Sequence, residues 1–187
     1  MSRSRALALA IVSVVVGSAV GCKRPRHAHV PSYSASAVPA GFVQRPGAGW
    51  VIAVPSTWRE AVQKGGAVWS AADPQRVDGF RANVNVVLEP FAGESYDYAA
   101  ANEVALRREP RATVEATRDA LVDGDPTLII ESRWVAAPPA TVGYRTLQSA
   151  LASRGFGYVA TCSVASTAFE RYRATCESIL KSFAVER

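Results

Sequence analysis

The sequence predicts an α+β domain built on a mainly antiparallel β-sheet, behind an export signal and a flexible tether. Strand patterns are grouped over residues 50–164 and are joined by hairpin signals, without the strand–helix–strand alternation of a parallel sheet. One helical pattern interrupts these strands and a second follows them. The first 48 residues differ in composition from the rest, which separates the domain from the segment before it.

The N-terminus has the pattern of a secretory signal. Arg3 and Arg5 precede an apolar run over residues 6–16, which is too short to cross a membrane. The following residues, Ala19-Val20-Gly21-Cys22, resemble the bacterial lipobox, in which the cysteine thiol carries diacylglycerol and becomes the mature N-terminus. We therefore predict a signal peptide over residues 1–21 and a lipid anchor, with palmitate, at Cys22. An ordinary signal peptide, with this cysteine free or paired, is the alternative.

Residues 22–48 are expected to form a disordered, lipid-anchored tether. Four of them are Pro and few are large and apolar, so the segment cannot bury enough surface to offset the entropy of ordering. The residue after Cys22 is Lys23, not the Asp that favours inner-membrane retention in enteric bacteria. The expected location is the bacterial cell envelope, with the chain anchored in the outer membrane and facing the periplasm.

The net charge of +5 belongs to this N-terminal part. Six of the 21 basic residues precede Trp50 and all 16 acidic residues follow it, so residues 50–187 carry 15 basic against 16 acidic groups. Binding to a nucleic-acid backbone requires clustered Lys and Arg, which a nearly neutral domain does not supply. No nucleic-acid partner is expected.

The domain begins with three strand patterns and a helix. Trp50–Pro55 is rich in aromatic and β-branched residues and stops at Pro, which is typical of a strand. Ala67–Ser70 is a shorter candidate, and Phe80–Pro90 alternates with the period of a half-buried strand. Ser95 is expected to cap a helix over Tyr96–Arg108.

Two hairpins and a second helix complete the order. Residues 113–136 contain two strand patterns around an Asp-Gly turn, and residues 141–164 repeat this arrangement around a second turn that contains Gly. Thr167 and Glu170 have the spacing of a capping box. The helix after them has one apolar face, which predicts that it lies against the sheet.

The order of these patterns carries a resemblance to a known family. The opening Gly49–Trp58, the strand at 80–89, the Tyr-rich start of the first helix and the closing 179–183 resemble the PsbP/Mog-like superfamily, including bacterial DcrB-related and LpqN-type lipoproteins. The resemblance covers most of residues 49–185 and implies a twisted antiparallel sheet flanked by helices, in a domain over 49–187. Family members are mainly binding or accessory proteins, and no catalytic motif is carried over.

The domain lacks the residues of common catalytic and metal sites. Both histidines, His27 and His29, lie in the tether, so neither a Ser-His-Asp site nor an ordinary zinc site can form in the domain. The acidic residues show no spacing that fixes two carboxylates at a catalytic separation. No cofactor and no metal are expected.

Two cysteines and one tryptophan are the other candidate site residues. In an oxidising envelope, Cys162 and Cys176 are expected to form a disulfide between the last strand and the last helix. Two buried thiols or a redox couple are the alternatives. Trp58, beside charged residues, is the best candidate for a half-exposed binding aromatic, with core packing as the preferred interpretation.

These observations predict a lipid-anchored cell-envelope lipoprotein with a non-catalytic binding or accessory domain. Its expected partners are the membrane, through the Cys22 anchor, and an unknown envelope protein or small ligand. The alternative is a histidine-free envelope hydrolase that uses carboxylates or a hydroxyl. Two carboxylates that converge in a cleft, with raised pKa, would distinguish the hydrolase.

Overall fold

The computed structural model describes residues 32–33, 38–63, 66–136 and 142–187. Its elements follow in the order β1 (Ser32–Tyr33), β2 (Phe42–Gly47), β3 (Trp50–Pro55), β4 (Arg59–Glu60), β5 (Ala67–Ala72), β6 (Asn83–Pro90), α1 (Ser95–Arg108), β7 (Ala112–Val122), β8 (Asp125–Trp134), β9 (Tyr144–Ser153), β10 (Phe156–Ala165), a 3₁₀ turn (Ser166–Ala168), α2 (Phe169–Lys181) and β11 (Ala184–Val185). The signal peptide and Cys22 lie outside the described residues.

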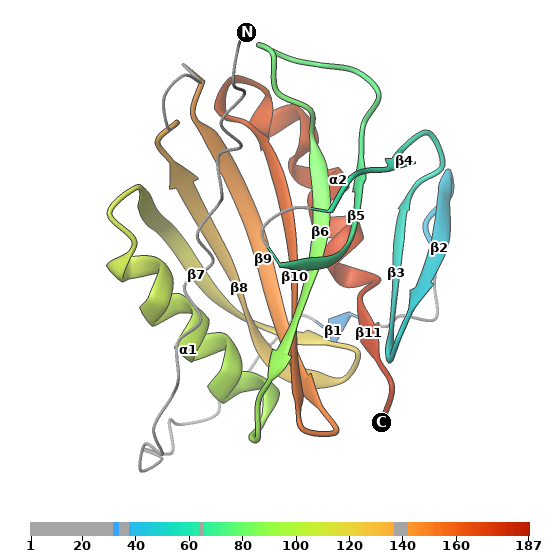
Figure 1. Ribbon diagram of the computed structural model, residues 1–187, viewed down its shortest axis with the longest axis vertical. Coiled ribbons are helices and arrows are strands. Elements are labelled where there is room, and N and C mark those ends of the chain that lie inside the picture. The colour runs from blue at the N-terminus through green and yellow to red at the C-terminus, as the bar shows by residue number, and fades with distance from the viewer. Residues whose placement is uncertain (1–31, 34–37, 64–65, 137–141) are drawn as a thin grey trace, which may run out of the picture.

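The strands form two sheets (Figure 1). The larger sheet has eight strands in the order β1-β7-β8-β9-β10-β6-β5-β4, and the smaller sheet has the order β11-β3-β2. The pairs are antiparallel except for β1 with β7, where Ser32 lies beside Leu121. The predicted α+β class with a mainly antiparallel sheet is therefore confirmed.

The hairpins form where the sequence predicts them. The loop between β7 and β8 is Asp123-Gly124, and the loop between β9 and β10 is Arg154-Gly155. Both residues of each loop have positive φ, from 51° to 81°. This is the backbone of a type I′ turn, whose twist matches that of the flanking strands, and Gly adopts it without steric cost. The two turns align β7 with β8 and β9 with β10.

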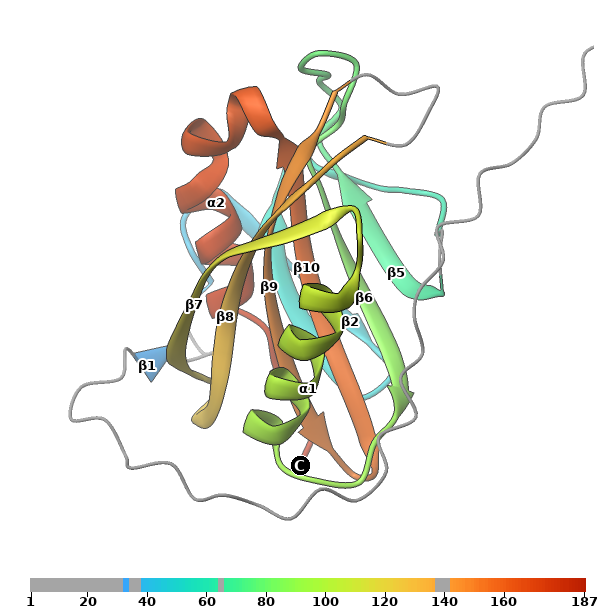
Figure 2. The same cartoon turned by 90° about the vertical axis from the view of Figure 1, so that its left-hand side faces the viewer.

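The two helices cover opposite faces of the larger sheet (Figure 2). Helix α1 packs against β7, β8 and β9, whereas α2 packs against β10, β9 and strand β3 of the smaller sheet. The main core lies on the α2 side and includes Trp50, Trp69, Phe169 and Phe183. A smaller core, centred on Tyr98, lies beneath α1. In the part of the chain that the structure describes, neither helix has the length and apolarity needed to cross a membrane.

The folded domain begins earlier than the sequence predicts. Strand β2, Phe42–Gly47, lies inside the predicted disordered tether, yet all six of its residues are in register with β3. Phe42 and Val43 also pack against the main core. The domain boundary at residue 49 and the disorder of residues 42–47 are therefore wrong. The flanking Pro and Gly suggested a linker, but β3 supplies the hydrogen-bond partners that the local composition does not reveal.

Both helix starts differ from their predicted caps. Glu94, not Ser95, occupies the position before α1, and the Ser95 hydroxyl instead accepts a hydrogen bond from the Ala152 amide at 2.8 Å. A 3₁₀ turn precedes α2, and the Thr167 hydroxyl donates to Asp78 rather than to its own helix. In each case the polar side chain connects the helix start to another segment.

Candidate functional site

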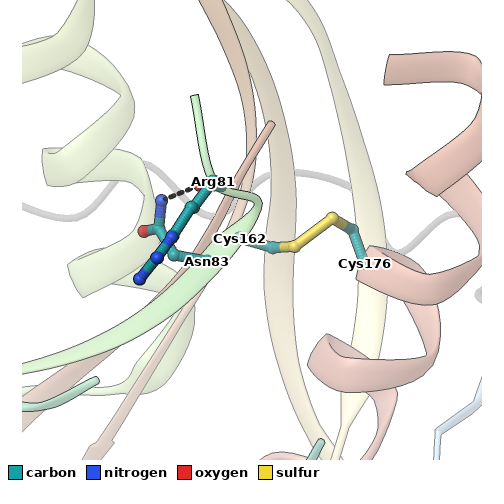
Figure 3. Close-up of a disulfide and its surroundings, with 4 residues drawn as sticks. All are labelled: Arg81, Asn83, Cys162 and Cys176. Atoms are coloured by element: carbon teal, nitrogen blue, oxygen red, sulfur yellow. Dashed lines mark hydrogen bonds between the residues drawn. A yellow bond between two sulfur atoms is a disulfide. The ribbon is translucent and has the colours of Figure 1, made fainter. Parts of the chain in front are cut away.

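The predicted disulfide is present in the structure. Cys162 of β10 and Cys176 of α2 are bonded, with their Cα atoms 5.5 Å apart, and both residues are fully buried. Figure 3 shows the bridge on the α2 side of the sheet. Its burial in the main core indicates that it attaches the C-terminal helix to the sheet.

Trp58 does not present its ring to a partner. It is only 2% exposed and belongs to the main core. Its backbone amide donates to the Pro55 carbonyl at 2.9 Å, so the chain turns after β3 and directs the ring inward. The assignment of Trp58 as a half-exposed binding aromatic is corrected, and the core-packing interpretation describes it.

Carboxylates do gather at one place, on the α2 side of the sheet. Arg145 of β9 forms ion pairs with Glu115, Glu131 and Glu170, and Arg173 of α2 pairs with the last two. The hydrogen bond from Arg173 holds the pKa of Glu170 below its usual value. A general acid requires a raised pKa, so the pairing of this exposed carboxylate does not favour acid catalysis.

The hollow beside α2 is too small for an organic ligand. Its volume is about 10 Å³, which is room for about one water molecule, and it is lined by Arg118, Ile129, Glu177, Leu180 and Lys181. Across the described residues, no three His, Cys, Asp or Glu side chains form a group that could hold a metal ion.

A more distinctive surface lies on the α1 side of the sheet. Helix α1 covers β7, β8 and β9, and among the described elements none packs over the upper parts of β10 and β6 (Figure 1). The side chains there are polar. We call them the open strip: Arg81, before β6; Asn83 and Asn85, in β6; and Thr161 and Ser163, in β10.

The strand register arranges the open strip as a grid. Asn83 lies opposite Ser163, and Asn85 lies opposite Thr161. Figure 3 shows the Arg81 and Asn83 side chains on the side of the sheet that faces α1, opposite the disulfide. Val84 and Val86 alternate with the two asparagines and are buried in the main core, which fixes the polar side chains on the open face.

The open strip differs from neighbouring polar residues in its hydrogen bonding. Beneath α1, the Ser132 and Thr146 hydroxyls bond to each other at 2.7 Å. Within the described residues, by contrast, the side chains of Asn85, Thr161 and Ser163 form no hydrogen bond, although Ser163 is only 7% exposed. Their polar atoms are not among the buried unpaired atoms of the described residues, so they are open to solvent and free to bond to a ligand.

Three aromatic rings lie at the upper end of the open strip. Tyr144 stacks on Trp134 with ring centroids 5.7 Å apart, and on Phe80 with centroids 5.5 Å apart. All three are partly buried, and burial raises the pKa of the Tyr144 phenol. Phe80, which directly precedes Arg81, also packs against the main core.

Sequence reasoning identified part of this surface without recognising it. The alternation in Phe80–Pro90 predicts a polar face for Asn83 and Asn85, but it does not show what lies beside them. Thr161 and Ser163 become their neighbours only through the pairing of β10 with β6, which joins distant parts of the chain. The signal that could have located the strip is the same alternation in residues 158–164.

An eight-stranded sheet between two helices, with a smaller sheet beside α2, defines an α+β domain, and its fold is similar to those of solved PsbP-like and Mog1-like structures. Cyanobacterial PsbP (CyanoP) from Synechocystis sp. PCC 6803 is similar with a TM-score of 0.55 and 17% identity, over 80% of this chain and 95% of that one. The protein of unknown function PA94 from Pseudomonas aeruginosa has a TM-score of 0.52 and 13% identity, over 79% of this chain and 99% of that one.

The Ran-binding protein Mog1p of Saccharomyces cerevisiae has a TM-score of 0.50 and 11% identity, over 80% of this chain and 96% of that one. At these identities, the similarity shows a shared fold and does not carry an activity or a partner across. No family model and no curated protein matches the sequence.

Proposed function

We propose that this protein is a lipid-anchored lipoprotein of the bacterial cell envelope, of the DcrB-related or LpqN type, with a non-catalytic binding or accessory domain. The observation that carries the binding role is the open strip, where the side chains of Asn85, Thr161 and Ser163 have no hydrogen-bond partner among the described residues. The lack of histidine after residue 29 supports a role without catalysis.

The proposed partner is another envelope protein. The open strip lies across two strands and is not an enclosed pocket, which suits a macromolecule better than a small ligand. Mog1p is named as a Ran-binding protein, so a domain of this fold binds a protein in that case.

The anchor is tested by replacing Cys22. We propose that this residue attaches the chain to the outer membrane. Several acyl chains give stable anchoring, since each buried methylene contributes about 0.8 kcal/mol. The Cys22→Ser variant is expected to move to the soluble periplasmic fraction and to lose palmitate labelling. The anchor would be refuted if the Cys22→Ser variant stayed in the membrane fraction and the unsubstituted protein took up no palmitate label.

The binding role is tested by crosslinking in cells. A photoreactive phenylalanine analogue at Thr161, in the open strip, is expected to give a discrete crosslinked product. The same analogue at Arg171, an exposed residue of α2 on the opposite face of the sheet, serves as the control. Equal products from both positions, or none from Thr161, would contradict a binding role for this surface.

A further inference from the structure

The spacing of the open strip matches an extended polypeptide. Asn83 and Asn85 are two residues apart on β6, so their side chains repeat every ~6.6–6.8 Å, and Thr161 and Ser163 repeat equally on β10. Opposed side chains on such a strand pair are separated by roughly 4.5–5.5 Å. An extended peptide repeats its backbone amides with the same two-residue period, whereas a helix advances only about 3 Å in two residues.

The chemistry of the grid also suits a peptide backbone. An Asn amide and a Ser or Thr hydroxyl each donate and accept hydrogen bonds, as a backbone with both N–H and C=O groups requires. The side chains of Asn85, Thr161 and Ser163 are free for this role in the described part of the chain. A glycan presents mainly hydroxyls, and an N-acetylated sugar carries its amide on a side group and not in a continuous backbone with this two-residue repeat.

The charge of the open strip indicates which kind of peptide it would bind. The open strip contains no carboxylate, and Arg81 at its upper end is exposed without an ion pair to any described residue. An acidic group on the ligand would supply the missing counter-charge and form charge-assisted hydrogen bonds with the guanidinium. The chain's own N-terminal segment carries Lys23, Arg24 and Arg26, which have the same sign as Arg81 and do not complement it.

We propose that the open strip binds an extended acidic segment of a partner protein, with its backbone over the Asn, Ser and Thr side chains and a carboxylate at Arg81. This inference rests on the proposed function of the domain as a binding module, and it specifies the partner's charge and conformation.

The experiment uses the mature chain, residues 22–187, and a random library of displayed peptides of about 12 residues. Selected peptides are expected to be acidic. Binding of the synthesised consensus peptide, followed by fluorescence anisotropy, is expected to weaken about tenfold or more in Arg81→Glu and about fivefold in Asn85→Ala. The control Arg171→Glu changes an exposed arginine of α2, on the opposite face of the sheet, and is expected to leave affinity unchanged.

A charge-swapped peptide, with Lys at the acidic positions, is expected to restore binding to the Arg81→Glu variant. Circular dichroism and thermal unfolding check that each variant is folded, and Asn85→Ala keeps the test informative because its side chain bonds to no described residue. Peptides without acidic residues, or equal affinity for Arg81→Glu and Arg171→Glu, would overturn the proposal.

Two further results would assign the strip to another occupant. Binding of an N-acetylglucosamine tetramer that weakens in Asn85→Ala would identify a glycan site. Peptide binding that tightens about tenfold when Lys23, Arg24 and Arg26 are all replaced by Ser would identify the chain's own N-terminal segment as the occupant. Both outcomes leave the Cys22 anchor test unaffected, so failure of this inference is distinguishable from failure of the proposed function.

Discussion

Tyr98 shows how one side chain fixes the position of a helix. It is 2% exposed, and its hydroxyl donates to the Glu89 carboxylate at 2.8 Å. Its ring lies over Gly157 of β10, where an added Cβ would be 2.3 Å from the ring. Because the glycine has no side chain, α1 can approach the sheet closely at this point.

Tyr98 is expected to make the domain sensitive to alkali. Burial, and then the hydrogen bond to Glu89, raise the pKa of its phenol well above its ordinary value of 10.0. The unfolded chain therefore releases this proton before the folded chain does. The stabilising effect is complete below pH 10 and is lost as pH rises further, by up to about 1.4 kcal/mol per pH unit.

Urea unfolding at pH 7 and at several values above pH 10 measures this dependence. Tyr98→Phe is expected to be less stable at neutral pH, because it loses the hydrogen bond to Glu89, yet to lose less stability in alkali. Tyr96→Phe, on the same helix, is the control. An equal alkaline slope for Tyr98→Phe and the unsubstituted protein would contradict the role of this phenol.

Gly157→Ala is expected to destabilise the domain by about 1–3 kcal/mol, since the new methyl group overlaps the Tyr98 ring and α1 must shift. The double variant Gly157→Ala with Tyr98→Leu is expected to recover part of this loss. Chemical unfolding of the two single variants and the double variant gives the coupling free energy. If the changes in unfolding free energy of the two single variants simply add in the double variant, the clash is relieved elsewhere than at Tyr98.

At the scale of elements, α2 is held to the sheet in two ways. Its apolar face, including Ile179 and Leu180, is buried in the main core, and Cys176 is bonded to Cys162. The periodicity of the sequence predicted the first attachment, and the even number of cysteines in the domain predicted the second. The start of the helix was not predicted, because Thr167 bonds to Asp78 in a distant loop.

Replacing Cys162 and Cys176 together by Ala is expected to lower the free energy of unfolding by about 3 kcal/mol, since the bridge closes a loop with a sequence separation of 14. The fold is expected to persist because the apolar face of α2 remains buried. Urea unfolding of the variant and of the oxidised protein provides the comparison. A variant of equal stability would show that the bridge is dispensable.

At the scale of the whole molecule, local patterns predicted the elements but not their arrangement. The hairpins β7–β8 and β9–β10 depend on short loops, which the turn residues reveal. The pairing of β6 with β10 joins Asn85 to Thr161 across a long sequence separation, and no local signal specifies it. For the same reason, the alternation over residues 80–90 cannot distinguish a solvated face from the open strip.

The true start of the domain can be tested by truncation. A chain that begins at residue 38 lacks β1 and is expected to unfold at a slightly lower temperature than one that begins at residue 23, because it loses only the two-residue pairing of β1 with β7. A chain that begins at residue 49 lacks β2, which leaves the edge of β3 unpaired and removes Phe42 and Val43 from the core. Its thermal transition is expected to be lower and broader, as differential scanning calorimetry would show.

The pairing of β1 with β7 bears on how far the domain can lie from the proposed lipid attachment. Ser32 lies beside Leu121, ten residues after the proposed lipid attachment at Cys22. Ten extended residues span at most about 33–36 Å, whereas the twenty residues to Phe42 would span twice that length. With the chain anchored at Cys22 as proposed, this short parallel strand would halve the height above the bilayer that the domain can reach, and would limit it to partners that come near the membrane surface.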